Sequence, residues 1–514
     1  MGLVLGLSSA AFGWGFYAWF GLIPLMLLSK SSDSFKTAFY ECSLFLFAYN
    51  LITLFWLQGL HPLTWQGFSE IESIALTNSA WLVASLFHSL LALPFVLVLK
   101  LFYKYRADRR SHELKILDIL FIAFVWLVCQ HKFLLHFHVL SVPINFLAYG
   151  QYKNIYLIQI ANLIGVIGLE YVIVVFNLAI SNLFNVQMSN QGLATHLKAE
   201  SGNLNVKRPF FGINGPIDQL NIFSILALVF VLIYGYGFMQ VKTTQEWDLN
   251  NFSKMKSFSI VQADYSAASS RSANGNATSI FNLQNQLSSK LIDKQDLLIW
   301  SEGAVPSVDK PEALNDLMKF ANDFAFGTYT REAGSYYNSI QFRDFVNEDQ
   351  VYNKRLLVSF GEYTPFYSLL PASLKLLANS TVGQGFAHAP DDQGLIDVKA
   401  GKIAPALCFE LLFPDLIRST VLKGADLILN LNDLSWFKGN KLTRDWIKRQ
   451  FLAVAVFRAV ENKRDLILAG NSGYSALINS YGKIKYQSEA NKIALVQGHY
   501  SLRDGFSAYG LYGW

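Results

Sequence analysis

Three residues in the second half of the chain combine types and positions that could carry nucleophilic chemistry. Cys408 closes an apolar run expected to form a strand, Glu302 follows another such run, and Lys354 lies in the segment Tyr352-Asn-Lys-Arg-Leu-Leu357. Because a free cysteine has a pKa of about 8.5, a nucleophilic thiol needs a base to take its proton or a cation to favour the thiolate. Glutamate and lysine can fill these two roles.

Each of these residues also has an ordinary structural interpretation. Cysteine is often a small buried hydrophobe, lysine a surface charge and glutamate an acid at the start of a helix. Histidine, the usual partner of a catalytic cysteine, occurs in this half only at His388 and His499, and neither lies in a motif typical of cysteine proteases. The succession of Glu302, Lys354 and Cys408 at strand ends favours a catalytic site, with simple packing as the alternative.

The elements that must position these side chains follow from the pattern after about residue 256. Short apolar or β-branched runs alternate there with amphipathic segments, which is typical of a layered α/β fold. The predicted strands are 258–263, 297–300, 325–330, 339–343, 403–409, 427–431 and 465–469. The predicted helices are 278–292, 314–324, 414–423 and 445–462. Because such folds place chemistry at strand ends, we expect this half to carry the active site.

The first half of the chain has the composition of a membrane protein. Of the 514 residues, 52% are hydrophobic and only 15% are charged, and the long charge-free runs lie before about residue 242. We therefore expect a polytopic membrane domain at 1–242, with six or seven helices, followed by a catalytic domain at 243–514. The candidate spans are 3–28, which the glycines of Phe12-Gly-Trp-Gly-Phe16 could divide, 39–56, 81–103, 116–135, 155–184 and 222–241.

The loops between these spans predict the orientation of the chain. The loops at 29–38, 104–115 and 185–221 carry ten Lys and Arg residues, whereas those at 57–80 and 136–154 carry only Lys153. Because cytoplasmic loops retain positive charge, the nearly uncharged loops are expected to face outward. The last span then delivers the catalytic half to the outside of the cytoplasmic membrane.

Composition argues against several other classes of protein. The cysteines Cys42, Cys129 and Cys408 lie far apart, with no C-x-x-C pair and no histidine at metal-ligand spacing, so we expect neither a disulfide framework nor a metal site. The net charge is +5, and the second half lacks a basic cluster interleaved with aromatic residues, so we expect no nucleic-acid partner. No organic cofactor is expected.

Five runs around the candidate residues carry a family resemblance. They are 299–306, 337–340, 352–366, 408–410 and 432–437. Together they resemble the apolipoprotein N-acyltransferases, a membrane-embedded branch of the nitrilase or carbon-nitrogen hydrolase superfamily. The run Lys354-Arg-Leu-Leu-Val-Ser-Phe-Gly-Glu362 is specific to that branch, whereas Glu302, Lys354 and Cys408 alone indicate only the superfamily. The similarity covers nearly the whole chain.

The resemblance implies a fold and a reaction. The fold is a nitrilase-type αββα sandwich on a helical membrane base, held as a monomer in the cell inner membrane. The reaction is an acyl transfer in two halves, in which Cys408 takes an acyl chain from the sn-1 ester of a phospholipid, phosphatidylethanolamine. The resulting thioester then passes the chain to the amino group of a diacylglyceryl-cysteine at the start of an apolipoprotein.

The resemblance also implies roles for individual residues. Glu302 is the general base, and Lys354 stabilises the oxyanion of each tetrahedral intermediate. Two further acids of the motif, Glu362 and Glu410, orient the lysine or shuttle protons, with a structural role as the alternative. Trp436 lines the acyl pocket or packs in the core.

Some positions depart from the pattern of the family. Phe409 stands where the family usually has tyrosine, Ser301 and Ser359 replace prolines, and the 432–437 run is one residue longer than usual. The sequence stops at Trp514, about where a closing membrane helix of the family would begin, so we expect that this helix is lost or that the sequence is truncated.

Two other functions stay open at the level of sequence. A membrane-tethered nitrilase-like amidase would hydrolyse its thioester instead of passing the acyl chain to a lipidated amine. A non-catalytic protein that binds lipids or lipoproteins would not need to keep Glu302, Lys354 and Cys408 together. An acyltransferase must admit lipid from the side, so we expect a hydrophobic cleft beside Cys408 that opens toward the outer leaflet.

Overall fold

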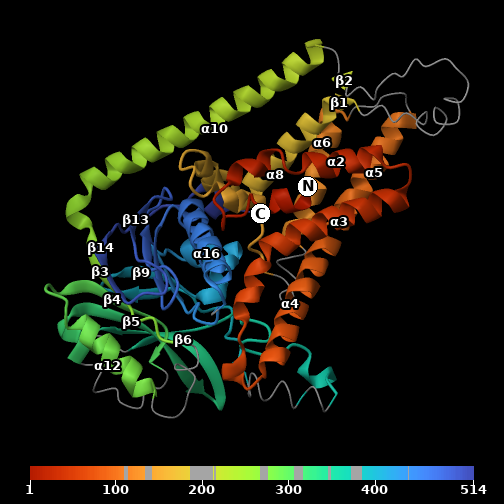
Figure 1. Ribbon diagram of the computed structural model, residues 1–514. Helices are drawn as coiled ribbons and strands as arrows, with labels where there is room; N and C mark the ends of the chain where they lie inside the picture. Colours follow the sequence, from red (N-terminus) through yellow and green to blue (C-terminus); the bar gives the residue numbers. More distant parts are fainter. Residues whose placement is uncertain are drawn as a thin grey trace, which may run out of the picture.

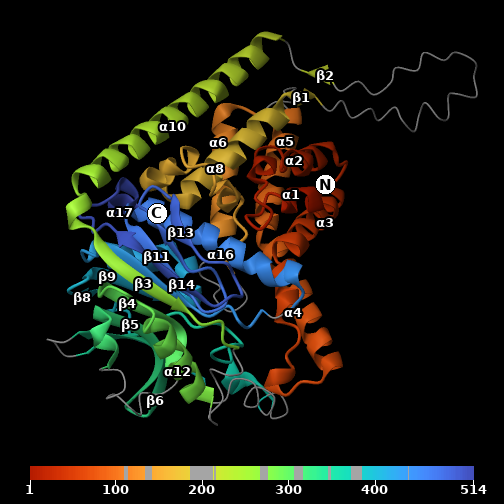
Figure 2. The same ribbon diagram turned by 60° about the vertical axis from the view of Figure 1, so that its left-hand side comes forward.

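The computed structural model describes residues 1–108, 114–132, 142–185, 212–213, 216–266, 276–305, 316–344, 349–371, 375, 385–437 and 439–513. Figures 1 and 2 show a body of helices from the first half of the chain beside two β-sheets from the second half. The helix α10 (Pro216–Asn250) runs along the outside of both parts and leads into the first sheet.

The helical body contains helices of very different length. They are α1 (Gly2–Gly6), α2 (Ile23–Ser31), α3 (Phe35–Thr53), α4 (Glu70–Leu91), α5 (Leu93–Asp108), α6 (Ile116–Leu127) and α8 (Ala161–Asn182). Short 3-10 turns lie between them, including η1 (Gly15–Trp19), η2 (Phe55–Leu60), η5 (Leu147–Gln151) and η6 (Leu157–Ile160). Ser69 and Glu72 form a reciprocal capping box that starts α4.

Three stretches in the described ranges are long and apolar enough to cross a membrane, by length and composition. They are Glu70–Ala107, Leu157–Asn182 and Ser224–Asn250, and the apolar stretch Ile116–Gln130 is shorter. The three long stretches include most of the expected spans at 81–103, 155–184 and 222–241. The chain is therefore a membrane protein with about three candidate spans of this length. Residues 133–135 of the expected fourth span lie outside the described residues.

The first expected span, 3–28, is not one helix. It is divided into α1, η1 and α2, and the break falls at the expected glycines. Gly13 has φ +73°, a left-handed conformation that favours glycine, and a Cβ at Gly15 would lie 2.1 Å from the carbonyl oxygen of Gly150. These two positions need glycine. The backbone conformation there is not helical, so the segment cannot form one continuous helix.

The second half forms two six-stranded sheets. The first sheet has the order β14-β3-β4-β5-β6-β7 and the second β13-β12-β11-β10-β9-β8. The first sheet contains β3 (Lys256–Gln262), β4 (Gln295–Val305), β5 (Ala321–Glu332), β6 (Ser335–Asp344), β7 (Gln350–Asn353) and β14 (Ala494–Tyr500). The second contains β8 (Ile396–Val398), β9 (Gly401–Leu407), β10 (Leu427–Asn432), β11 (Asp465–Gly470), β12 (Ala476–Ile478) and β13 (Ile484–Gln487).

The two sheets face each other across one apolar core. Alternate residues such as Ile299 of β4 and Leu429 of β10 belong to the same buried cluster. The outer face of the first sheet packs under α12 (Asn276–Ser288), where Trp300 lies among apolar side chains. The outer face of the second sheet packs under α15 (Pro414–Leu422) and α16 (Lys441–Asn462). The layers are therefore helix, sheet, sheet and helix, which confirms the predicted αββα sandwich.

The helix α16 belongs to the sandwich and to the helical body at once. Its apolar residues share one buried cluster with α3, α6 and α8. Several polar contacts cross the same boundary. Among them, Gln450 Nε2 donates to the carbonyl of Thr53 at 3.1 Å, Arg458 Nη2 to Tyr149 Oη at 2.8 Å, and the amide of Val166 to a Glu461 carboxylate oxygen at 2.7 Å. The two halves of the chain are thus joined through a common core.

Two predictions of secondary structure are wrong. The segment 314–324 was expected to be a helix, but in its described part only Asp316–Lys319 forms a 3-10 turn and β5 begins at Ala321. The partners of that strand decide its conformation, since it pairs with both β4 and β6. The strand expected at 403–409 ends at Leu407 because Cys408 begins the 3-10 turn η10 (Cys408–Leu412).

Candidate active site

Glu302 lies on β4 at a point where the pairing with β5 is irregular. The register between the two strands shifts between Trp300 and Val305. A Cβ at Gly327 of β5 would lie 2.5 Å from the Cα of Glu302, so the close approach of these strands needs glycine. The carboxylate accepts hydrogen bonds at Oε1 from Asn338 Nδ2 (2.8 Å) and at Oε2 from the amide of Asp433 (2.8 Å). Three separate elements therefore fix the direction of this acid.

Lys354 follows β7 and is buried between two acids. Its Nζ lies 2.8 Å from Glu362 Oε1 and 3.4 Å from Glu302 Oε1, and its own amide donates to the carbonyl of Asn338 at 2.8 Å. Burial lowers the pKa of Lys354, but the carboxylates of Glu362 and Glu302 outweigh burial and hold the pKa above its ordinary value. The side chain is 1% exposed, so the structure holds a permanent cation inside the sandwich.

Asn338 connects the two acids around this lysine. Its Nδ2 donates to Glu302 Oε1 at 2.8 Å and to Glu362 Oε1 at 2.7 Å. The other oxygen of Glu362 accepts from the amide of Val358 at 2.8 Å. Burial raises the pKa of Glu362, but the ammonium of Lys354 and these hydrogen bonds lower it further than burial raises it. Glu362 is therefore a carboxylate that orients the lysine.

Cys408 is placed at the start of η10, directly after β9. Its φ of +45° is in the left-handed region, which costs a non-glycine residue about 1–3 kcal/mol and is common at functional sites. Burial raises the pKa of the thiol, the negative charge of Glu302 raises it further, and the charge of Lys354 opposes the rise, with the net pKa well above its ordinary value. Cys408 therefore rests as a thiol and would need a base to become a nucleophile.

Glu410 ties the turn that holds Cys408 to the segment that holds Lys354. It is fully buried and accepts from the amides of Leu407 (2.7 Å), Arg355 (2.7 Å) and Leu356 (3.1 Å) and from the hydroxyl of Tyr352 (2.8 Å). Burial raises the pKa of this carboxyl group above its ordinary value. The carboxylate of Glu410 thus holds four donors in place, and through them it can position the turn of Cys408 relative to the segment of Lys354.

Asp433 and Asn471 also contact the site, although no role was predicted for them. Asp433 donates its amide to Glu302, and its own carboxylate accepts from Asn471 Nδ2 at 2.9 Å. Asn471 also binds the main chain of Tyr265, whose hydroxyl donates to the carbonyl of Glu302 at 2.5 Å. Burial raises the pKa of Asp433 to about 6. Asn338 and Asp433 lie inside the runs 337–340 and 432–437, so the resemblance contained a signal for them.

Two predicted aromatic residues flank the site in different settings. Phe409 is half-buried and packs edge-to-face on Phe413, with ring centroids 5.1 Å apart. Trp436 is half-buried in the turn that follows Asp433. The next residue, Phe437, meets Trp56 of the helical body with ring centroids 5.4 Å apart. The turn at 433–437 therefore reaches from Glu302 to the helices.

The expected cleft beside Cys408 stays a prediction. The structure contains a cavity of about 390 Å³ in the helical body and one of about 310 Å³ between α4, η2 and the start of α16, and neither is lined by Cys408. Across the described ranges, no group of three or more His, Cys, Asp or Glu side chains is arranged to hold a metal ion.

The αββα sandwich places the second half of the chain in the class of carbon-nitrogen hydrolase-like domains. The model of the carbon-nitrogen hydrolase family matches residues 314–503, and the model of the apolipoprotein N-acyltransferase N-terminal domain matches residues 1–179. The two matches, in this order, cover most of the helical body and the sandwich from β5 onward, whereas β3 and β4, with Glu302, lie between them. The chain belongs to the apolipoprotein N-acyltransferase family.

Relatives along the whole chain agree with this assignment. The apolipoprotein N-acyltransferase of Geobacter metallireducens is 27% identical over 530 residues, which cover 100% of this chain and 90% of the relative. That of Synechocystis is 24% identical over 536 residues, which cover 99% and 95%. That of Pseudomonas syringae is 34% identical over 203 residues, which cover 37% of this chain and 38% of the relative. Among solved structures, a carbon-nitrogen hydrolase superfamily protein from Xanthomonas campestris is 16% identical, with a TM-score of 0.36 over 48% of this chain and 91% of its own. That likeness is too distant to carry an argument.

Proposed function

We propose that the chain is an apolipoprotein N-acyltransferase that moves an acyl chain from a phospholipid to the amino terminus of a lipoprotein through Cys408. The observation that carries this proposal is the buried cluster in which Lys354 lies between Glu302 and Glu362, beside a cysteine in a left-handed turn, on a body of membrane helices. The names of the full-length relatives support the same activity.

In the first half-reaction Glu302 takes the proton of the Cys408 thiol, and the sulfur attacks the sn-1 ester carbonyl of the phospholipid. The oxyanion that forms faces the ammonium of Lys354, which the carboxylates of Glu362 and Glu302 keep charged against the opposing effect of burial. Collapse of the intermediate breaks the ester bond, and the proton held by Glu302 goes to the leaving alkoxide. The products are an acyl thioester on Cys408 and a lysophospholipid.

In the second half-reaction the amino group of a diacylglyceryl-cysteine attacks the thioester carbonyl. Glu302 takes a proton from the attacking amine, Lys354 again faces the oxyanion, and the sulfur leaves as a thiolate that regains its proton. The product is an amide, and Cys408 returns to the thiol. Glu362, Asn338, Glu410 and Asp433 hold these groups in place without touching the substrate. Trp436, which lies in the turn after Asp433, would line the path of the acyl chain.

The membrane arrangement belongs to the same proposal. We place the membrane helices within residues 1–242 and the catalytic half, 243–514, on the extracytoplasmic side of the inner membrane, because basic residues gather in alternate loops of the sequence. The phospholipid donor, phosphatidylethanolamine, and the lipoprotein acceptor both have their reactive groups at the membrane surface. A monomeric acyltransferase at that surface can reach both substrates directly, so it needs no soluble protein to carry the acyl chain.

The test is intact-mass spectrometry of the purified protein after incubation with phosphatidylethanolamine, beside the Cys408→Ala variant and the Cys42→Ala variant as a matched control. We expect a hydroxylamine-labile acyl adduct on the parent and on Cys42→Ala, and none on Cys408→Ala. When a diacylglyceryl-cysteine peptide is added next, the protein should lose the acyl adduct and the mass of the peptide should increase by that of the acyl group. Loss of the adduct to water with no acylated peptide would identify the membrane-tethered amidase instead, and no adduct with reduced Cys408 would refute both enzymes.

A further inference from the structure

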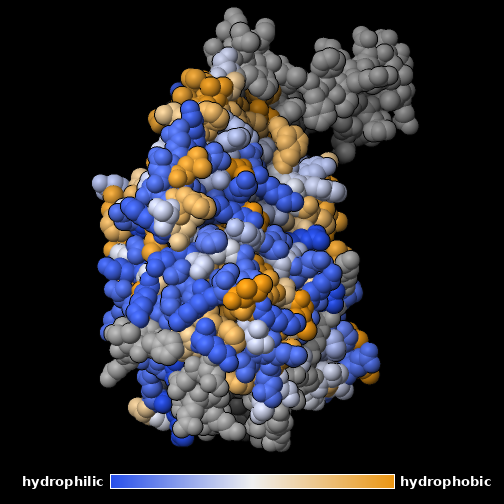
Figure 3. Space-filling view, turned by 90° about the vertical axis from the view of Figure 1, so that its left-hand side faces the viewer, coloured by the Kyte–Doolittle hydropathy of each residue, from blue (hydrophilic) through white to orange (hydrophobic). Residues whose placement is uncertain are grey.

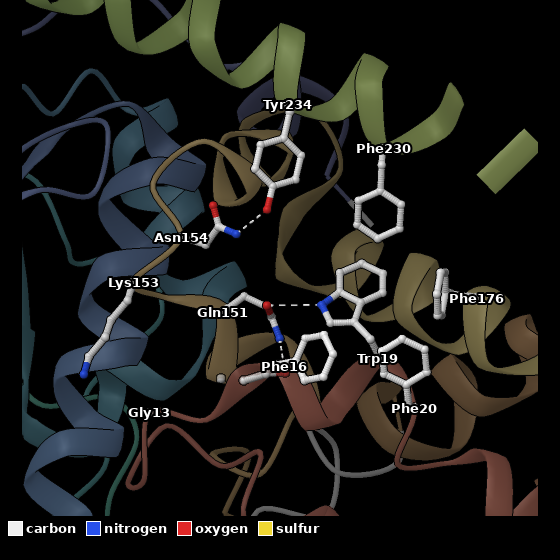
Figure 4. Close-up of a pocket in the computed structure, with 12 residues that line it drawn as sticks. Gly13, Phe16, Trp19, Phe20, Gln151, Lys153, Asn154, Phe176, Phe230 and Tyr234 are labelled. Carbon is white, nitrogen blue, oxygen red and sulfur yellow. Dashed lines mark hydrogen bonds between the residues drawn. The ribbon is translucent and has the colours of Figure 1, made fainter. Parts of the chain in front are cut away.

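A cavity of about 390 Å³ lies in the helical body, and no residue of the candidate active site lines it. Figure 4 shows the residues that do. Its volume falls in the range of roughly 300–1,000 Å³ that is common for ligand pockets. The walls come from η1, η5, α8 and α10, which are far apart in the sequence. None of the residues that line it belongs to the sandwich, so the cavity is separate from the proposed acyl transfer.

The cavity has one aromatic end. Phe20, Phe176, Phe230 and Trp19 meet there, with the Trp19 and Phe230 rings 4.8 Å apart and the Phe20 and Phe176 rings 5.4 Å apart, in both cases between centroids. Figure 4 shows these rings side by side on one wall. Phe176 and Phe230 belong to two of the candidate membrane spans, so this end lies where the surrounding solvent is lipid.

The other end of the cavity is polar and carries one cation. Gln151 Nε2 donates to the carbonyl of Gly15 at 2.6 Å, and Asn154 Nδ2 donates to Tyr234 Oη at 2.5 Å, so both amides already have partners. Lys153 is the basic residue among those that line the cavity, and in the part of the chain that the structure describes its Nζ lies over the Tyr152 ring, at 5.6 Å from the centroid. Lys153 is exposed, and within the described residues it forms no ion pair with an acid.

Two further features place this polar end at the surface of the bilayer. Exposed aromatic residues cover the adjacent turn around η1, with Trp14 54% and Phe16 70% exposed, and such residues gather at the level of lipid headgroups. Phe12, at the entry to this turn, packs on Trp446 of α16, so the polar end lies on the side of the catalytic half. The mouth of the cavity therefore meets the same leaflet as the candidate active site.

We propose that this cavity binds one phospholipid of that leaflet, with its phosphodiester against the ammonium of Lys153 and one acyl chain against the aromatic end. The cavity is smaller than a whole two-chain phospholipid, so the second chain stays in the bilayer. The occupant is a membrane phospholipid and not a soluble phosphate, because one end of the cavity is aromatic and takes Phe176 and Phe230 from two candidate membrane spans. Lys153 is also the single basic residue in the loops expected to face outward, which gives that position a use beyond topology.

The test is native mass spectrometry of the full chain in detergent, with phosphatidylglycerol as the probe. All samples carry Cys408→Ala, so that no lipid can be retained as a thioester. We compare Lys153→Gln and Lys153→Arg with Lys242→Gln, which removes the same charge from an exposed site on α10 outside the cavity. Loss of one lysine–phosphate attraction at a membrane surface is worth about 1 kcal/mol, so Lys153→Gln should lower the affinity of the retained lipid about fivefold. Lys153→Arg and Lys242→Gln should keep it.

Two further probes locate the bound lipid. Diacylglycerol with the same acyl chains lacks the phosphate, so its affinity for the protein with Lys153 should be no higher than that of phosphatidylglycerol for Lys153→Gln. Inorganic phosphate should not compete with phosphatidylglycerol for the cavity. A phosphatidylglycerol with a photoreactive group in its acyl chain should label peptides that contain Trp19, Phe176 or Phe230. Equal retention by Lys153→Gln and Lys242→Gln, or label confined to the surroundings of residue 408, would overturn the proposal. Failure of the acyl-transfer reaction would leave these results unchanged.

Discussion

Replacement of Lys354 by methionine tests the electrostatic account of the candidate active site most directly. Methionine has a similar length and no charge, so it removes the ammonium without leaving a large void. The ammonium of Lys354 balances the carboxylates of Glu302 and Glu362 in the parent protein. In the variant both acids stay buried, and the donor that they still share is Asn338 Nδ2. Removing one partner of a buried ion pair destabilises proteins by about 3–5 kcal/mol, and we expect a loss in that range at neutral pH.

The pH dependence of the loss follows from the direction of each pKa shift. In the parent protein the pKa of Lys354 is raised, so its contribution to stability is complete below the ordinary lysine pKa and falls only when the pH rises through the raised value. The pKa of Glu362 is lowered, so its contribution is complete above the ordinary glutamate pKa and falls when the pH drops through the lowered value. The contribution of the pair should therefore be constant between about pH 5 and pH 10.

The Lys354→Met variant should behave differently. Without the ammonium, burial and mutual repulsion raise the pKa of one of the two acids, so the folded state binds more protons than the unfolded state. The free energy of unfolding then decreases as the pH rises from 5 to 8, by about 1.4 kcal/mol for each unit of that pKa shift. A second change, Glu362→Gln, removes the excess negative charge and should recover part of the loss.

The measurement is urea unfolding of the detergent-solubilised chain, followed by circular dichroism at pH 5.5 and pH 8. Lys492→Met is the matched control, because Lys492 is 62% exposed and pairs with Glu489, which is 73% exposed, so its loss should change stability little. If Lys354→Met is no less stable than Lys492→Met, or if its deficit does not grow with pH, the cluster is not the charge-balanced unit described here.

Two other perturbations separate further contributions. Glu302→Gln should lower the pKa of the Cys408 thiol, since the charge of Glu302 raises that pKa, so alkylation by iodoacetamide at pH 8 should become faster. The same variant should form the acyl thioester at least roughly 100-fold more slowly because it lacks the general base; slower alkylation would argue against the electrostatic assignment. Arg458→Met should destabilise the chain by about 3–5 kcal/mol, because Arg458 is fully buried and lies 2.6 Å from Glu461. Urea unfolding would measure that loss, and the double variant Arg458→Met, Glu461→Gln should regain part of it; no difference between the single and double variants would show that the pair is not coupled.

The order of the central elements could be predicted from the sequence, because their own residues decide it. The strands β3, β10 and β11 were placed within about two residues of their ends, since each is a short segment that contains apolar residues and is mostly buried. The short strands β8, β12 and β13 were missed, because strands of three or four residues exist only through their partners. The start of β5 was taken for a helix for the same reason.

The boundary at residue 242 illustrates another limit of sequence patterns. Hydropathy ends the last span at 241, but α10 continues to Asn250, where Lys242 and Glu246 lie one turn apart and Asp248 pairs with Arg503. A helix of 35 residues is about 52 Å long, which exceeds the roughly 30 Å of hydrocarbon, so part of it stands outside the bilayer. Figure 3 shows the molecule from the left-hand side of Figure 1, with hydrophobic residues gathered toward the upper end and mostly hydrophilic residues below.

The three central residues of the candidate site could be selected from the sequence, whereas some of the groups that hold them in place could not. Glu302, Lys354 and Cys408 could be selected because their types suit nucleophilic catalysis, and the structure brings them into one electrostatic unit. Asn338 and Asp433 act through an amide side chain and a main-chain N–H, and neither group stands out in a sequence. The left-handed turn at Cys408 depends on Glu410 and its donors, which come from separate strands.

The shared position of α16 has a consequence for the order of events during synthesis. This helix, residues 441–462, fills the surface between α8 and the second sheet, yet the ribosome makes it after nearly all the other large elements. Until it emerges, the apolar side of the N-terminal helices that receives it stays uncovered. The N-terminal helices therefore cannot complete their packing before α16 is made, and both halves of the chain complete their folding in the same late step.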